Sequence, residues 1–254
     1  MSVQKQRMKK AVVVGGSNGI GLSLALSLQN YSDVYIVDRQ AFAPPCELPT
    51  GGTQYHAVVF DLLSDDYALF DQFADADTLI ITAGVGRLAL FGDTREEEID
   101  RSFRVNTVGP MRIIRRFYDR ISAPDDDFYC VVMASIAGHL SSPFFSIYSA
   151  TKAALHRFIE SVNIELEQGG TKNRILEVSP GSIEGTNFYG GDNDLSQTLP
   201  LAEAILQCMY GRETCYIPQY EAVFKEVIAR YQSDPHRFGL ESFAYKQKRM
   251  REKK

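Results

Sequence analysis

Short apolar runs alternate with longer segments of helical periodicity along most of the chain. The apolar runs are rich in β-branched residues and lie at 11–14, 34–37, 57–60, 79–82, 129–133, 175–178 and 215–217. Helical periodicity occupies 20–29, 64–73, 95–121, 147–167 and 200–210. Continuous apolar runs are typical of parallel strands, which are covered by helices on both faces and joined by helix-sized crossovers. The pattern predicts an α/β fold built on one doubly wound parallel sheet of about seven strands.

The same pattern predicts the domain organisation. It contains no internal repeat and no linker long enough to divide the chain, so we expect residues 1–254 to form a single domain. Its core should span about 10–217, followed by a C-terminal helix and a basic tail over 218–254. Thr94 and Glu97 have the spacing of a capping box and predict a helix start there.

Composition and charge exclude several classes of function. A formal charge of -5 is unlike the basic face of a nucleic-acid-binding protein, and no apolar run approaches the roughly 18 residues of a membrane helix. The basic N-terminal stretch is followed by an apolar run too short for a signal-peptide core. Cys46, Cys130, Cys208 and Cys215 lack metal or redox spacing, so we expect reduced thiols, no metal and a cytoplasmic protein.

A glycine-rich turn links the first predicted strand to the first predicted helix. The stretch VVVGGSNGIG places Gly15, Gly16, Gly19 and Gly21 within seven residues. A helix N-terminus attracts phosphate through unpaired N–H groups and the helix dipole. The spacing departs from G-x-G-x-x-G, but a strand before the glycines and a helix after them favour a phosphate-binding turn in a Rossmann-type sheet. An ordinary glycine-rich connection is the alternative.

The second predicted strand, DVYIVDR, ends in Asp38, 17 residues after Gly21. A carboxylate at about that distance commonly accepts hydrogen bonds from the adenosine ribose, and it would repel the 2′-phosphate of NADP. We therefore expect NAD as the cofactor. Arg39 could instead pair with that phosphate, or with Asp38 as a surface ion pair of little energetic value.

Tyr148 and Lys152 lie four residues apart in YSATKAALHRF and so share one helix face. Such a pair more often marks a solvated face. Here the small neighbours Ala150, Ala153 and Ala154 permit close packing. A phenol with a pKa near ~10 is a poor acid–base catalyst at neutral pH, but a nearby ammonium lowers that pKa.

These motifs occur together in one order. The glycine turn and Asp38 are followed by TAG at 82–84, RVN ending at Asn106, SIAG from Ser135, YSATK from Tyr148 and SPG at 179–181. The combination, with Pro143 between Ser135 and Tyr148, resembles the classical short-chain dehydrogenase/reductase family over about residues 10–217.

The resemblance implies a role for each matched residue. Tyr148 would be the general acid/base, Lys152 would lower its pKa and hold the nicotinamide ribose, and Ser135 would hydrogen-bond the substrate oxygen. Asn106 would hold a helix irregularity and a water of the proton relay. The resemblance also implies a set of cofactor-binding residues. Gly15, Ser17, Gly19, Ile20 and Gly21 would line the pyrophosphate, Asp61 and Leu62 would meet the adenine, and Pro180, Gly181 and Ile183 would pack against the nicotinamide. The remaining members of the set are Asp38, Ala83, Gly84, Tyr148 and Lys152.

The chain departs from the family pattern at three positions. Thr82 stands where the family has asparagine, so a hydroxyl must replace the amide contact. Val14 replaces a threonine, and Thr186 comes one residue late after Pro180-Gly181. Two interpretations are open for each of the other candidates. His139 either contacts substrate or packs without a functional role. The aromatic residues either line an apolar pocket or belong to the core; they are Phe144, Phe145, Phe188 and Tyr189.

The function implied by the resemblance is hydride transfer between NAD(H) and a secondary alcohol or ketone. Alternatives are a nucleotide-sugar epimerase or dehydratase of the related extended class, and a non-enzymatic dinucleotide-sensing regulator. Residues 185–199 should form a lid over a substrate that the sequence does not identify. Helices near 95–121 and 147–167 are those that classical members use for dimer contact, so we expect a homodimer or homotetramer.

Overall fold

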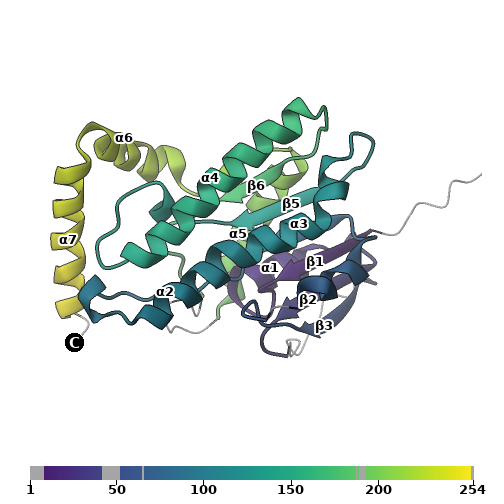
Figure 1. Ribbon diagram of the computed structural model, residues 1–254, viewed down its shortest axis with the longest axis horizontal. Coiled ribbons are helices and arrows are strands. Elements are labelled where there is room, and N and C mark those ends of the chain that lie inside the picture. The colour runs from purple at the N-terminus through teal and green to yellow at the C-terminus, as the bar shows by residue number, and fades with distance from the viewer. Residues whose placement is uncertain (1–8, 42–51, 65, 187, 189–192, 253–254) are drawn as a thin grey trace, which may run out of the picture.

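The computed structural model describes residues 9–41, 52–64, 66–186, 188 and 193–252, which contain one parallel seven-stranded sheet (Figure 1). Its strand order is β3-β2-β1-β4-β5-β6-β7. The strands are β1 (Lys10–Val14), β2 (Asp33–Asp38), β3 (Gln54–Val59), β4 (Thr78–Ile81), β5 (Tyr129–Met133), β6 (Ile175–Val178) and β7 (Cys215–Tyr216). The predicted doubly wound parallel sheet is confirmed.

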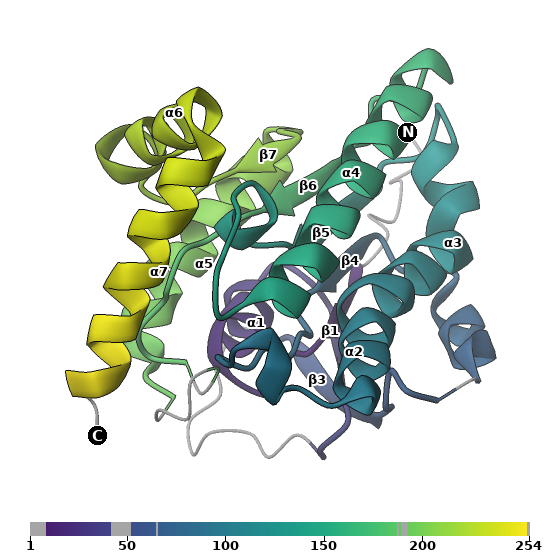
Figure 2. The ribbon, with the colours of Figure 1, turned by 60° about the vertical axis from the view of Figure 1, so that its left-hand side comes forward.

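Helices cover both faces of this sheet (Figures 1 and 2). They are α1 (Gly19–Ser27), α2 (Glu96–Phe103), α3 (Gly109–Ser122), α4 (Ser146–Gln168), α5 (Leu195–Tyr210), α6 (Lys225–Ser233) and α7 (Pro235–Glu252). Val12 and Val14 of β1 pack into the core beneath α3 and α4, whereas Val13 packs into the core beneath α1 and α5. Burial on both faces explains why the strands are continuously apolar.

The register brings the carboxyl ends of the central strands to one edge. Val14 pairs with Val37 of β2 on one side and with Ile81 of β4 on the other. The chain reverses its direction of travel across the sheet between β1 and β4, and ligands of open α/β sheets bind at such a switch point. The glycine turn leaves β1 at this edge.

The helix start predicted near Thr94 and Glu97 is confirmed, since α2 begins at Glu96, but two local details of the prediction were wrong. The segment predicted as a helix at 64–73 forms a 3₁₀ helix over Tyr67–Phe73. The Thr94–Glu97 capping box does not form, because the Thr94 hydroxyl donates to the Phe91 carbonyl oxygen (2.6 Å) and α2 begins at Glu96 without a side-chain cap. The hydroxyl satisfies a preceding turn instead of the helix N-terminus.

The predicted helix at 95–121 is interrupted at the place where Asn106 lies. Residues Arg104–Val108 form a π-helical turn between α2 and α3. Single π turns inside α-helices commonly lie at functional sites.

The C-terminal segment forms two helices instead of a helix and a tail. The rings of Phe243 in α7 and Phe144 stack with centroids 4.8 Å apart, which fixes α7 to the loop before α4. Cys46, Tyr189, Lys253, Lys254 and most of the predicted loop at 39–53 lie outside the described residues. In the ranges that the structure describes, no helix is both long and apolar enough to span a bilayer.

Candidate active site

A cavity of about 810 Å³ lies at the carboxyl edge of the sheet and extends from Asp38 and Asp61 to Lys246 and Arg249. Most of the predicted site residues line it: Gly15, Gly19, Ile20, Gly21, Asp38, Asp61, Leu62, Ala83, Gly84, Ser135, Tyr148, Lys152, Pro180, Gly181 and Ile183. Ser17 and Asn106 are not among its lining residues.

The glycine turn packs tightly against the end of β4. Gly15 has φ +84°, and a Cβ there would lie 2.5 Å from the Ala83 nitrogen; a Cβ at Gly21 would lie 2.2 Å from the Gly15 oxygen. The Thr82 hydroxyl is within hydrogen-bond distance of the carbonyl oxygens of Val14 (3.2 Å) and Gly15 (3.0 Å). Two glycines are therefore needed for close approach, and the threonine hydroxyl ties β4 to the turn where the family has an amide.

The N-terminus of α1 faces the cavity, and its N–H groups donate to oxygen atoms. The Gly19 N–H donates to the amide oxygen of Asn193 (3.2 Å), and Asn18 provides no side-chain cap. A phosphate oxygen is a stronger acceptor for the same N–H group at a helix N-terminus. The residues present therefore fit the pyrophosphate of a dinucleotide. Thr186 lies over Gly19, with its methyl group 3.5 Å from the position of a Cβ there.

Ser17 supports Asp38. Its N–H and its hydroxyl both donate to Oδ2 of Asp38, at 3.2 and 2.7 Å. The position of Ser17 at the pyrophosphate stays a prediction; in the structure its hydroxyl donates to the carboxylate at the end of β2. Asp38 forms no ion pair with Arg39, although both line the cavity that the described residues enclose. The second oxygen, Oδ1, accepts from the Gln40 N–H at 3.5 Å and retains a further lone pair for a ribose hydroxyl.

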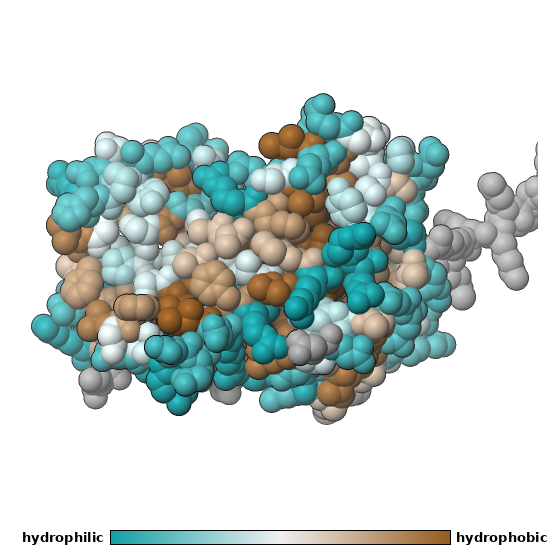
Figure 3. All heavy atoms as spheres, in the orientation of Figure 1, coloured by the Kyte–Doolittle hydropathy of each residue, from teal (hydrophilic) through white to brown (hydrophobic). Residues whose placement is uncertain are grey.

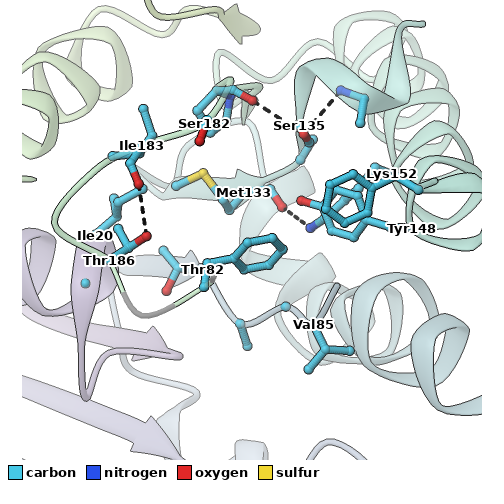
Figure 4. A pocket seen from close by; sticks show the side chains of 18 of the residues that line it. Ile20, Thr82, Val85, Met133, Ser135, Tyr148, Lys152, Ser182, Ile183 and Thr186 are labelled. Atoms are coloured by element: carbon cyan, nitrogen blue, oxygen red, sulfur yellow. Dashed lines mark hydrogen bonds between the residues drawn. The ribbon is translucent and has the colours of Figure 1, made fainter. Parts of the chain in front are cut away.

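Tyr148 and Lys152 enter the cavity from α4 (Figure 4). Lys152 is 2% exposed, and its ammonium donates to the Met133 carbonyl oxygen at 2.7 Å. The Nζ atom lies 5.8 Å from the centroid of the Tyr148 ring. Burial lowers the pKa of Lys152 to about 8, opposed by the negative charge of Glu177. The pair thus combines a phenol with a cation of perturbed pKa, which is typical of catalytic sites.

Ser135 follows β5 and lines the cavity together with this pair. Its hydroxyl accepts from the Ala137 N–H (3.2 Å) and lies 3.4 Å from the Pro180 carbonyl oxygen. The first contact caps the 3₁₀ helix Ile136–Gly138, which fixes the side chain at the strand end. A hydroxyl held in this way can bind a substrate oxygen.

Asn106 acts on the loop after β4. Its amide accepts from the N–H of Val85 and donates to the carbonyl oxygen of the same residue, both at 2.8 Å, and it donates to the Thr151 hydroxyl (3.0 Å). A Cβ at Gly84 would lie 3.5 Å from both the Asn106 Oδ1 and the Lys152 Nζ. The π turn directs this amide inward, where it holds residues 84–85 beside Lys152.

His139 packs behind the site. Its Nε2 lies 3.0 Å from a carboxylate oxygen of Glu177, and the Nδ1 of His156 lies 2.7 Å from the other oxygen. Burial acts to raise the pKa of Glu177, but hydrogen bonds from His139, His156 and Ser179 outweigh it and hold that pKa at about 2. The ligand atoms of the three residues His139, His156 and Glu177 lie within 4.8 Å, but hydrogen bonding already accounts for this arrangement.

Sequence reasoning missed Glu177 and His156. The available signal was one acidic residue inside the otherwise apolar run ILEV, since a buried carboxylate requires partners.

Two of the predicted aromatic residues flank the tyrosine. The rings of Phe145 and Phe188 lie 5.2 and 5.5 Å from the Tyr148 ring. Phe144 belongs to the packing beneath α7, with φ +66° and 8% exposure. Sequence reasoning also missed a set of lining residues from the C-terminal segment: Val223, Phe224, Val227, Phe238, Ser242, Tyr245, Lys246 and Arg249.

Comparison with known proteins defines the class to which this fold and site belong. Residues 9–194 match the family model for short chain dehydrogenases. The chain belongs to this family of oxidoreductases, whose members bind a nicotinamide dinucleotide.

Among relatives, the chain is 26% identical to an uncharacterized oxidoreductase of Staphylococcus epidermidis, over 81% of this chain and 92% of the relative. It is 30% identical to a probable tetrahydroxynaphthalene reductase of Zymoseptoria tritici, over 71% and 70% of the two chains. Among solved structures, a short-chain dehydrogenase/reductase of Burkholderia phymatum in complex with NAD superposes with TM-score 0.75 at 18% identity (89% and 94% covered). One from Sphingobium yanoikuyae in complex with NADPH gives TM-score 0.71 at 22% identity (89% and 96%).

Proposed function

We propose that this protein transfers a hydride between NAD(H) and a secondary alcohol or ketone, with Tyr148 as general acid/base. The observation that carries the proposal is one continuous cavity. The glycine turn and Asp38 lie at one end of it, and Ser135, Tyr148 and Lys152 converge further along.

In this proposal each side chain acts on the substrate oxygen or on a neighbour. When bound, NAD supplies the hydride acceptor. Tyr148 passes a proton to or from the substrate oxygen, and Ser135 donates a hydrogen bond to that oxygen. The Lys152 ammonium favours the phenolate of Tyr148. Asn106 is a positioning residue, because its amide holds Val85 and the neighbouring backbone.

The preference for NAD rests on Asp38. Its carboxylate lies at the end of β2, lines the cavity and is oriented by two hydrogen bonds from Ser17. A carboxylate so placed accepts from a ribose diol and repels a 2′-phosphate. Arg39 lines the same end of the cavity and is the feature that favours NADP.

The two alternatives account for fewer of the observations. Epimerases and dehydratases of the extended class usually have G-x-x-G-x-x-G, whereas the glycine turn of this chain has the spacing Gly15-x3-Gly19-x-Gly21. Dinucleotide-sensing regulators tend to lose the catalytic tyrosine or lysine, and this chain retains Asn106, Ser135, Tyr148 and Lys152.

We further propose that the chain is one catalytic domain, is cytoplasmic and assembles into a homodimer or homotetramer. In Figure 3, apolar and weakly polar side chains gather along the middle of the face formed by α2, α3 and α4, with hydrophilic side chains around them. Val108 of the π turn and Ile164 of α4 are 37% and 59% exposed, and exposed apolar side chains favour contact between copies of the chain.

A substrate panel tests the proposal. Secondary alcohols are screened with NAD and ketones with NADH, and each reaction is followed by the absorbance of NADH. We expect turnover with at least one alcohol–ketone pair in both directions. Binding of NAD without turnover of any pair would support the regulator instead.

A further inference from the structure

One face of α7 forms a wall of the cavity. Phe238, Ser242, Tyr245, Lys246 and Arg249 recur at helical spacing and all line it. The close approach of Gly239 to the Ser141 hydroxyl, 3.5 Å from a Cβ position, and the stacking of Phe243 on Phe144 hold this helix against the site. Figure 2 shows α7 running along that side of the molecule.

Lys246 places a cation in this wall. Its ammonium donates to the Ser142 hydroxyl (2.6 Å) and to the Pro143 carbonyl oxygen (3.0 Å), and it lies 5.7 Å from the centroid of the Phe145 ring. Both hydrogen-bond partners are neutral. Burial lowers the pKa of Lys246 to about 8, as expected for a cation withdrawn from water without a counter-ion.

The lining carboxylates of the cavity lie away from the cations of α7; Arg39 lines the carboxylate end as well, and Arg101 and Lys152 are further lining cations. These carboxylates, Asp38 and Asp61, belong to β2 and to the loop after β3, where the adenosine is expected. At the α7 end the charged lining residues are Lys246 and Arg249. Neither has a carboxylate within ion-pair distance among the described residues, and the Arg249 guanidinium instead contacts the Tyr245 hydroxyl (3.2 Å).

One aromatic ring separates the Lys246 ammonium from Tyr148. Phe145 lies between them, with its centroid 5.7 Å from the Lys246 ammonium and 5.2 Å from the Tyr148 ring centroid. Phe188 and Phe224 add apolar lining nearby. A substrate whose oxygen meets Tyr148 can therefore present an apolar body to these rings and a negative group to α7.

We propose that the substrate of this protein carries a carboxylate, separated from the reacting alcohol or ketone by an apolar or aromatic body and bound by Lys246 with Arg249 beside it. This inference rests on the proposed oxidoreductase function. A carboxylate would supply the missing counter-charge through charge-assisted hydrogen bonds.

The test compares 4-acetylbenzoate with its neutral isostere 4-acetylbenzamide. Ketone reduction is measured as kcat/KM, and both compounds are also titrated calorimetrically into the protein with NAD present, so that the anion site is judged separately from turnover. We expect the benzoate to be preferred about 10- to 100-fold, the range for a hydrogen bond to a charged group.

Substitution then identifies the residue. Lys246→Met keeps an unbranched side chain of similar length and removes the charge, so it should abolish the preference while the benzamide values change less than about threefold. Lys246→Arg should restore much of the preference. Lys248→Met, a loss of charge on the same helix outside the cavity lining, should leave both compounds unaffected.

Each outcome decides one of the two proposals. Equal binding of the two compounds, preference for the amide, or a preference that survives Lys246→Met would overturn the anion site. If the benzoate binds preferentially but no ketone is ever reduced, the oxidoreductase proposal fails and the anion site stands.

Discussion

The ammonium of Lys152 is a buried charge, and the folded chain carries its desolvation cost. Its pKa is about 8 in the folded protein against 10.5 ordinarily. Below pH 8 the full cost is present. Between pH 8 and 10.5 the folded protein has released a proton that the unfolded chain still holds, so stability rises with pH across this window.

Lys152→Met should therefore stabilise the protein in the absence of NAD. At pH 7 relief of the desolvation is worth up to about 3 kcal/mol, since each pKa unit corresponds to about 1.4 kcal/mol, and the net gain is smaller because the Met133 carbonyl oxygen loses its donor. The gain should vanish as the pH approaches 10.5. Urea unfolding at pH 7 and pH 10 measures the gain and its loss at high pH, and Lys172→Met, at an exposed position, serves as the control. A methionine variant less stable than the parent at pH 7 would contradict this account.

Asp38→Ala tests the choice of cofactor. Loss of a charge-assisted hydrogen bond costs on the order of 1.5–3 kcal/mol, so NAD should bind roughly one to two decades more weakly, and discrimination against NADP should relax. Fluorescence titration with both cofactors measures the effect, and Asp66→Ala on the surface serves as control. Equal affinity of the unsubstituted protein for NAD and NADP would refute the assignment.

At single positions, the sequence predicts the site best where only one residue type satisfies the steric requirement. Gly15 and Gly21 were predictable because a Cβ at either position would collide with backbone. The contact of Ser17 was not predictable, because spacing does not reveal that its hydroxyl donates to the Asp38 carboxylate.

At the element scale, β6 carries an unpredicted charge beneath the site. Glu177 is 2% exposed and favours the protonated form of Lys152. Glu177→Gln should therefore lower the pKa of Lys152 further below 8 and move the alkaline limb of the pH–rate profile to lower pH.

The pH–rate profile of the proposed reaction measures this shift. Glu165→Gln, on the exposed face of α4, controls for loss of an acidic residue. An unchanged alkaline limb in Glu177→Gln would show that this carboxylate does not influence Lys152.

The elements themselves were predictable to different degrees. The strands follow from continuous apolar runs, and α4 from its periodicity. The π turn at Arg104–Val108 was not predictable from periodicity, because it depends on the amide of Asn106 reaching the backbone of Val85. The 3₁₀ helix at Tyr67–Phe73 likewise differs from an α-helix by contacts that the pattern does not encode.

For the whole molecule, the sheet and its switch point could be derived from the order of elements, but the wall contributed by α6 and α7 could not. The sequence pattern after β7 is compatible both with helices exposed to solvent and with helices packed against the site. Their position depends on contacts such as Phe243 with Phe144, between residues about 100 positions apart along the chain.

Assembly is a prediction at this scale. We expect light scattering at micromolar concentration to give the mass of a dimer or tetramer, because the face of α2, α3 and α4 presents apolar side chains such as Ile164. Ile164→Glu should shift the population toward monomer. A parent protein that is purely monomeric would refute the prediction.

In the proposed reaction Tyr148 exchanges the proton while the neighbouring groups hold the ligands. Tyr148→Phe keeps the ring between Phe145 and Phe188 and removes only the hydroxyl. General acid–base catalysis contributes typically ~10²–10⁴-fold, so turnover should fall by at least about that factor, while NAD affinity changes little. Tyr220→Phe, outside the cavity lining, should retain full activity.

The decisive measurement is kcat of Tyr148→Phe on the best substrate of the panel, with NAD titrated into the same preparation. We expect normal NAD binding and a loss of turnover of at least about 100-fold, as removal of the acid/base requires. Normal NAD binding with turnover within a few-fold of the parent would contradict it.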